Sequence, residues 1–241
     1  MTVRIVPSDD QDAAAFRLAR ELTTLLSGLR WVCVGGLMVR VLEAEAGVVG
    51  SWSTGDVDAL MDVRAVSNAT EEASRRLINA GFFPDAKEDG LLYRFTRGRD
   101  IVDILAPDHL GPRANRRTVA PAETIEADGG RQALERLRQV GVDAGEGEFL
   151  LPCPDLAGAI IMKGRVVAAV ADPEGHAKHQ RDICRLLGLV PDPIAMRDCL
   201  TSRERAWLSQ LADLADVSHP AWSRIPGAED GVAALEILSK P

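Results

Sequence analysis

The sequence predicts an α+β protein in which a region containing strands, residues 1–152, is followed by a helical domain, residues 153–241. In the first region, short apolar or alternating runs typical of strands are interleaved with amphipathic runs typical of helices. After Pro154 the pattern changes to helices, and Thr201 with Glu204 gives one of them a capping-box signature. We therefore place a domain boundary near Pro152.

Composition limits the possible classes of protein. Hydrophobic residues make up 46% of the 241 residues, enough for a substantial core. No apolar run is long enough to span a membrane, and Met1 to Ser8 lack the apolar core of a signal peptide, so we expect a cytoplasmic protein. The net charge of −8 argues against a global attraction to nucleic acid. The four cysteines form no CxxC pair, which favours buried thiols over zinc ligands.

Periodicity and turn signals predict the individual elements. In the first region we expect helices over residues 13–26, 37–46, 70–80 and 130–140, and strands over 31–34, 56–63, 91–96, 99–105 and 149–151. The strands 91–96 and 99–105 flank Gly98 and are predicted to form a β-hairpin. In the second region we expect helices over 155–171, 174–187, 201–215 and 231–238.

Three aspartates stand out on the predicted strands. Asp56 and Asp58 are separated by one residue, so both carboxylates face the same side of a strand, with Cα atoms about 6–7 Å apart. Asp103 lies inside an otherwise apolar strand, where burial of a carboxylate is costly unless a cation compensates it. Hard divalent cations prefer such oxygen ligands. The pattern predicts a site for one or two Mg²⁺ (or Mn²⁺) ions.

A double-glycine turn precedes these acids. Gly35 and Gly36 follow the strand 31–34 and begin a helix, where backbone N–H groups can receive phosphate oxygens. Metal ions beside such a turn favour nucleotidyl transfer, with an NTP such as ATP as the substrate.

This order of features resembles the nucleotidyltransferase superfamily related to DNA polymerase β. The matching residues are Gly35-Gly36, Asp56-Val57-Asp58 and Asp103. The segment Thr54–Asp58 looks like the Thr-x-Asp-x-Asp motif of AbiEii-type nucleotidyltransferases, the toxin group of toxin–antitoxin systems. Residues 156–163 and 178–187 are similar to that group's Lys and Lys-x-x-x-Asp helices. The resemblance extends from about residue 29 to residue 189.

The resemblance implies a small mixed sheet flanked by helices, with a helical region at the C-terminal side, and an NTP-dependent enzyme. It implies that the three aspartates bind metal and that Asp103 is a base toward the acceptor hydroxyl. The acceptor would be RNA, with the 3′ end of tRNA favoured, and an antitoxin protein would be a partner. The remaining site residues that it implies are Gly35, Gly36 and Thr54 beside the phosphates, Lys163 on the triphosphate, and Lys178 and Asp182 in supporting positions.

The sequence departs from the family pattern at one position near the motif. Relatives often carry Arg or Lys two residues before the motif threonine, whereas this chain has Trp52 there. The segment between Gly36 and Asp56 is also long, at nineteen residues. We therefore expect that a basic contact to the triphosphate has been lost or has moved, while the three acids keep the enzyme active.

Two other functions fit the same residues. One is transfer of a nucleotide to a small molecule such as an aminoglycoside, since an acidic protein suits a cationic substrate. The other is a non-catalytic nucleotide-binding relic of the fold.

Several charged residues allow two interpretations each. Lys178 and Asp182, four residues apart on a helix, also fit an exposed ion pair. His176 and His179 are interpreted as surface residues. Six arginines near the hairpin form either a basic rim for an RNA backbone or a solvated face: Arg94, Arg97, Arg99, Arg113, Arg116 and Arg117.

Overall fold

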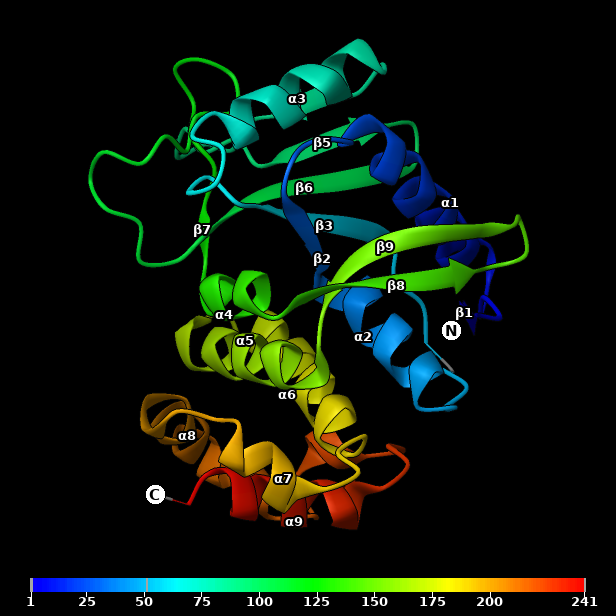
Figure 1. Ribbon diagram of the computed structural model, residues 1–241, viewed down its shortest axis with the longest axis vertical. Helices are drawn as coiled ribbons and strands as arrows, with labels where there is room; N and C mark the ends of the chain where they lie inside the picture. The colour runs from blue at the N-terminus through cyan, green and yellow to red at the C-terminus, as the bar shows by residue number, and fades with distance from the viewer. Residues whose placement is uncertain (1, 51, 241) are drawn as a thin grey trace. The chain divides into compact units, whose positions relative to one another are not determined.

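The computed structural model describes residues 2–50 and 52–240. The chain divides into two compact units, Met1–Pro154 and Asp155–Pro241 (Figure 1). Among the described residues, the first contains the strands and the helices α1 to α4, and the second is built from helices.

The larger sheet of the first unit is mixed, in the order β2-β3-β6-β5-β4, with β7 paired to β6. β3 pairs antiparallel with β2 and parallel with β6, and β5 pairs antiparallel with both β6 and β4. Its strands are β2 (Trp31–Val34), β3 (Asp56–Met61), β4 (Phe83–Asp85), β5 (Arg94–Arg97), β6 (Asp100–Pro107) and β7 (Glu126–Ala127). The expected hairpin around Gly98 is therefore present as β5 and β6.

Strand alternation separates the apolar face of this sheet from the acidic one. Val57 and Ala59 of β3 and Val102 and Ile104 of β6 are fully buried in the hydrophobic core. The same core takes in apolar residues of the helices α1 (Asp10–Leu25), α2 (Gly35–Glu45) and α3 (Ala69–Asn79). Because successive side chains point to opposite faces, the aspartates between these apolar residues face away from that core.

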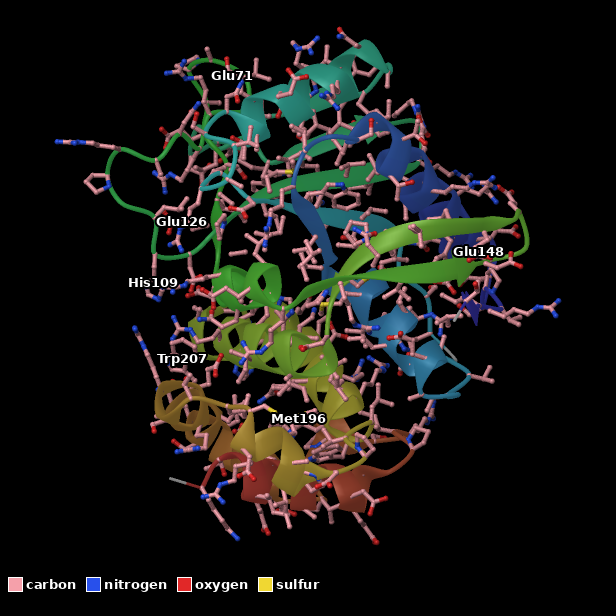
Figure 2. The ribbon with its side chains drawn as sticks, in the orientation of Figure 1. Glu71, His109, Glu126, Glu148, Met196 and Trp207 are labelled. Carbon is pink, nitrogen blue, oxygen red and sulfur yellow. The ribbon has the colours of Figure 1, made fainter. Side chains whose placement is uncertain are left out.

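A second sheet, with three strands, includes residues that the sequence predicted to be helical. Residues 130–140 are not one helix: α4 ends at Glu135 (Gly130–Glu135), and β8 (Leu137–Asp143) follows. β8 lies between β1 (Thr2–Arg4) and β9 (Glu148–Pro154), so its backbone bonds go to neighbouring strands. Glu148, at the start of β9, accepts a hydrogen bond of 2.6 Å from the Thr2 hydroxyl (Figure 2). Pairing with residues distant in the chain thus overrides local helical periodicity.

The second unit consists of helices with explicit caps. Asp155 accepts a hydrogen bond from the backbone N–H of Gly158 and begins α5. Thr201 and Glu204 form the expected capping box. The predicted helix 201–215 is interrupted: it ends at Leu208 and a 3₁₀ turn, Ser209–Ala215, follows. The α-helices are α5 (Leu156–Ala169), α6 (Pro173–Leu187), α7 (Pro193–Asp198), α8 (Ser202–Leu208) and α9 (Ala228–Leu238).

Within residues 2–50 and 52–240, no helix has the length and apolar character needed to cross a membrane.

Candidate active site

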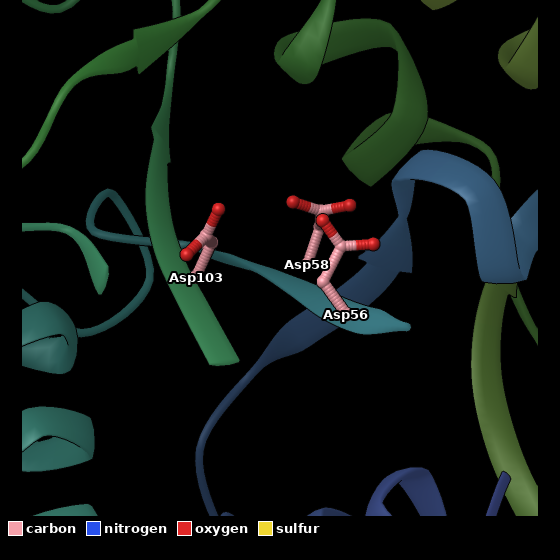
Figure 3. Close-up of side chains that lie close together, drawn as sticks. All are labelled: Asp56, Asp58 and Asp103. Carbon is pink, nitrogen blue, oxygen red and sulfur yellow. The ribbon is translucent and has the colours of Figure 1, made fainter. Parts of the chain in front are cut away.

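The three aspartates predicted as metal ligands lie together on the main sheet (Figure 3). Asp58 of β3 is directly opposite Asp103 of the parallel strand β6, and Asp56 lies on the same face of β3. One carboxylate oxygen from each residue lies within 4.8 Å of the others. Asp103 is buried, whereas Asp56 and Asp58 are partly exposed. This all-oxygen, closely spaced donor set is consistent with binding of a divalent cation.

Asp103 is held by an arginine from the neighbouring strand. Arg94 Nε donates to Oδ1 over 2.8 Å and Arg94 Nη2 donates to Oδ2 over 2.7 Å. The hydrogen bond to Asp103, together with the charges of Asp103 and Asp56, raises the pKa of Arg94. This pairing could have been predicted from the hairpin, because residues 94 and 103 are equally distant from its turn. In the structure the two residues face each other in the register. Arg94 is thus directed at the aspartates, whereas its position in the sequence predicted only a basic rim or a solvated face.

The double-glycine turn packs directly against the acids. Gly35 has φ +71°, a conformation that favours glycine, and a Cβ at this position would lie 1.6 Å from Asp58 Oδ2. A Cβ at Gly36 would lie 2.7 Å from Thr54 Oγ1, and that hydroxyl lies 3.1 Å from Asp56 Oδ1. Val34, the N-cap of α2, makes no side-chain capping bond. The first turn of α2 therefore has N–H groups suited to an anion, next to the aspartates.

Trp52 anchors the long segment before β3. Its indole Nε1 donates to Glu43 Oε2 over 2.9 Å, and the Arg40 guanidinium lies 5.9 Å from the ring centroid. Arg40 is itself buried, with a 2.8 Å ion pair to Asp12. The charge of Arg40 is matched by Asp12 and Glu43, so this cluster supplies no excess positive charge where the family pattern has a basic residue.

The C-terminal unit brings together two of the predicted site residues. Lys163 of α5 and Asp182 of α6 are buried, and Lys163 Nζ donates to Asp182 Oδ2 over 2.7 Å. Arg185 approaches the other oxygen of Asp182 at 3.4 Å. Lys178 is exposed. Asp182 is thus paired across two helices, which does not fit the exposed pair with Lys178 that the spacing also allowed.

His179 is not simply a surface residue. It is half-buried, and its Nδ1 atom is enclosed without a hydrogen-bond partner. Burial, followed by the nearby charge of Lys163, lowers the pKa of His179 to about 4. The side chain is therefore neutral near pH 7.

Carboxylates engage half of the six arginines near the hairpin. Arg94 pairs with Asp103, and Arg97 bonds Glu21 and Asp100. Arg116 bonds Glu123 and Glu126, the latter on β7 (Figure 2). These three arginines offer less free positive charge to an RNA backbone than their number in the sequence indicates.

The cysteines largely follow the expected pattern of buried thiols. Cys33, Cys153 and Cys184 are buried, whereas Cys199 is exposed. Burial is the main cause that raises the pKa of Cys184 to about 12, so this thiol is protonated and unreactive near pH 7.

Comparison with known proteins adds to this geometry. No protein-family model and no curated protein sequence matches the chain. Among solved structures, the chain is similar to an antigenic nucleotidyltransferase-like protein from Paracoccidioides brasiliensis, with a TM-score of 0.52 and 15% sequence identity. The match covers 98% of this chain and 96% of that chain.

The chain has a nucleotidyltransferase-like fold. The predicted fold class, α+β with a mixed sheet and C-terminal helices, is confirmed. On this nucleotidyltransferase-like fold, Asp56, Asp58 and Asp103 form a cluster of candidate catalytic aspartates.

Proposed function

We propose that this protein is a metal-dependent nucleotidyltransferase that moves a nucleoside monophosphate from an NTP to an acceptor hydroxyl. In this reaction the acceptor oxygen forms a bond to the α-phosphorus, the bond to the leaving pyrophosphate breaks, and the acceptor loses its proton. The observation that carries the proposal is the convergence of three carboxylates within 4.8 Å on a nucleotidyltransferase-like fold.

Asp56, Asp58 and Asp103 would hold Mg²⁺ or Mn²⁺, and the bound cation would supply charge neutralisation at the reacting phosphate. Asp103 is proposed to accept the acceptor's proton through an oxygen lone pair that Arg94 leaves available. Thr54, whose hydroxyl lies against Asp56, is proposed to orient that carboxylate beside the phosphates.

The triphosphate is proposed to lie at the start of α2. Gly35 and Gly36 let Asp58 and Thr54 pack against this turn, and the N–H groups of the first helical turn favour an anion there. Lys163 is proposed as a further triphosphate contact, with Asp182 in support, on the similarity of residues 156–163 and 178–187 to AbiEii-type toxins. Lys178 has a supporting role in this proposal.

RNA is the proposed acceptor, with the 3′ end of tRNA the preferred site and an antitoxin protein as the partner that silences the enzyme. The support for this part is the similarity of Thr54–Asp58 and of the segments 156–163 and 178–187 to AbiEii-type toxins.

The test incubates the full chain with labelled NTPs, Mg²⁺ and bulk tRNA. We expect label on RNA from the unmodified protein and none from Asp56→Ala. Intact NTP binding without transfer to any acceptor would contradict the enzyme proposal and favour the relic.

A second acceptor class would use a groove next to the N-terminal end of β3. The groove measures about 910 Å³ and is lined by Gly55, which precedes Asp56, and by Ile101, which pairs with Asp56 across the strands. Asp9 and Asp10 contribute carboxylates to it and Arg17 and Arg99 contribute guanidiniums, whereas the carboxylate of Asp100 is already paired with Arg97. The support for a small cationic acceptor such as an aminoglycoside is therefore the net charge of −8 of the whole chain. Label on aminoglycosides and none on tRNA would establish this acceptor and exclude RNA.

A further inference from the structure

Arg94 occupies an unusual position for a basic side chain, directly opposite a candidate metal ligand. It lies on β5, where it pairs with Asp103 of β6 in the antiparallel register. Its two bonds to the carboxylate, 2.8 and 2.7 Å, form a fork that fixes the plane as well as the position of the acceptor. The Asp103 side chain is only 8% exposed, whereas that of Arg94 is 31% exposed. The guanidinium thus orients a buried carboxylate from a partly solvated position.

The fork limits what Asp103 can offer to a cation. A carboxylate has about four lone-pair sites, and Arg94 engages one on each oxygen, which leaves about two. Arg94 also changes the charge of the cluster, because three carboxylates carry three negative charges and the guanidinium cancels one of them. Its presence reduces the repulsion among oxygens that lie within 4.8 Å of one another.

We propose that Arg94 is a positioning residue that aims Asp103 and lowers the affinity of the aspartate cluster for divalent cations. This inference rests on the proposed function only for its catalytic consequence, since its effect on metal binding does not require a substrate. In it, Asp103 is the ligand that a cation would share with Arg94. The fork keeps the Asp103 carboxylate oriented before a cation arrives.

The proposal predicts opposite effects on metal binding and on transfer. Loss of the guanidinium raises the net negative charge of the cluster, which strengthens attraction to a cation. The same loss frees Asp103 to rotate, which weakens transfer because reacting groups lose their alignment. Lysine keeps the charge but replaces the fork by a point contact, so it separates the two effects.

The first measurement is the affinity of the full chain for Mn²⁺. Mn²⁺ is titrated in the absence of nucleotide, and electron paramagnetic resonance detects the free ion. Arg94→Gln is expected to bind Mn²⁺ on the order of tenfold more tightly than the unmodified protein. Arg94→Lys is expected to stay within about threefold of it. Arg97→Gln is the matched control on the same strand, since Arg97 bonds Glu21 and Asp100, and its affinity should not change. Unchanged or weaker Mn²⁺ binding by folded Arg94→Gln would overturn the proposal.

The second measurement is transfer from labelled NTP, with KM and kcat determined separately. For Arg94→Lys we expect kcat to fall at least about tenfold with little change in the KM for NTP, because the charge stays and the alignment is lost. This variant carries the test alone if Arg94→Gln does not fold, and an unchanged kcat would then refute the positioning role. If even the unmodified protein transfers nothing while the Mn²⁺ shift is present, the proposed function fails and the role of Arg94 in metal binding stands.

Discussion

Two clusters of charge, a partly buried one in the first unit and a buried one in the second, differ in their balance of charge. In the first unit, three aspartates share a face of the sheet with the guanidinium of Arg94. In the second, Lys163 and Arg185 both approach the single carboxylate of Asp182. A buried anion with adequate partners is satisfied as it stands, whereas closely spaced carboxylates in excess favour an added cation. The first cluster is therefore the candidate for chemistry, and the second is a buried pair on which we expect the stability of the C-terminal unit to depend.

The largest effect is expected from removing an acid of the first cluster. Asp58→Asn should reduce nucleotidyl transfer by roughly a thousandfold or more, because a metal ligand is lost where charge must be neutralised. The free energy of unfolding should not fall, since the change also removes repulsion from Asp56 and Asp103.

Transfer assays and urea unfolding measure these two quantities on the same preparations. Glu88→Gln is the control, because it removes an exposed acid from the same unit. Retention of activity in Asp58→Asn would remove the chemical distinction between the two clusters.

Breaking the second cluster should affect stability first. Lys163→Met leaves Asp182 buried without its 2.7 Å partner, and we expect a loss of about 3–5 kcal/mol in the free energy of unfolding. The double variant Lys163→Met/Asp182→Leu should recover much of that loss, because the buried carboxylate is then removed together with its buried partner. Urea unfolding of the full chain gives both values. An equal loss of unfolding free energy in the single and double variants would show that the unpaired Asp182 carboxylate is not the cause of the loss.

A smaller effect on Mn²⁺ binding should distinguish Gly35, which packs against Asp58, from Gly28, which does not. Gly35→Ala and Gly28→Ala both place an alanine at positive φ, +71° and +79°, which costs about 1–2 kcal/mol in each case. Only at Gly35 does the new Cβ collide with Asp58, since nothing lies within 4 Å of a Cβ at Gly28. We therefore expect weaker Mn²⁺ binding for Gly35→Ala alone. Equal Mn²⁺ affinities in the two variants would argue against contact between the turn and the acid.

The smallest effect concerns pH and the second cluster. The pKa of His179 is lowered in the folded protein from its ordinary value of 6.5 to about 4. The unfolded chain therefore binds the proton more readily, so the stabilisation from neutral His179 is complete above pH 6.5 and is lost as the pH falls toward 4. Because the ring is only half-buried, solvent screening reduces the effect to about 1 kcal/mol. Urea unfolding gives the free energy of unfolding at each pH between 7 and 4.5. This free energy should depend less on pH for His179→Gln than for the unmodified protein, and an identical pH dependence would contradict the role of His179.

Local sequence patterns predicted much of the fold, and the predictions that were wrong have a common cause. The strand 31–34, the helices α5, α6 and α9 and the hairpin at Gly98 follow from periodicity and turn residues, whereas α7 was not predicted. Local patterns failed for β8, which pairs with the neighbouring strand β9 and with β1, more than a hundred residues away. They also failed for the 3₁₀ turn after Leu208, where Leu211 leaves the helical conformation. Long-range pairing and packing decided these segments.

By itself, the sequence determined that Asp56 and Asp58 share a face, because side chains alternate along any strand. It also determined that Gly35 and Gly36 begin a helix directly after a strand. Only the tertiary structure decided that Asp103 joins the pair, because that requires the parallel register of β3 with β6. The same holds for Lys163 and Asp182, which belong to different helices and meet only through packing. Local stereochemistry fixes which way a side chain points, but contact between distant segments fixes what it meets.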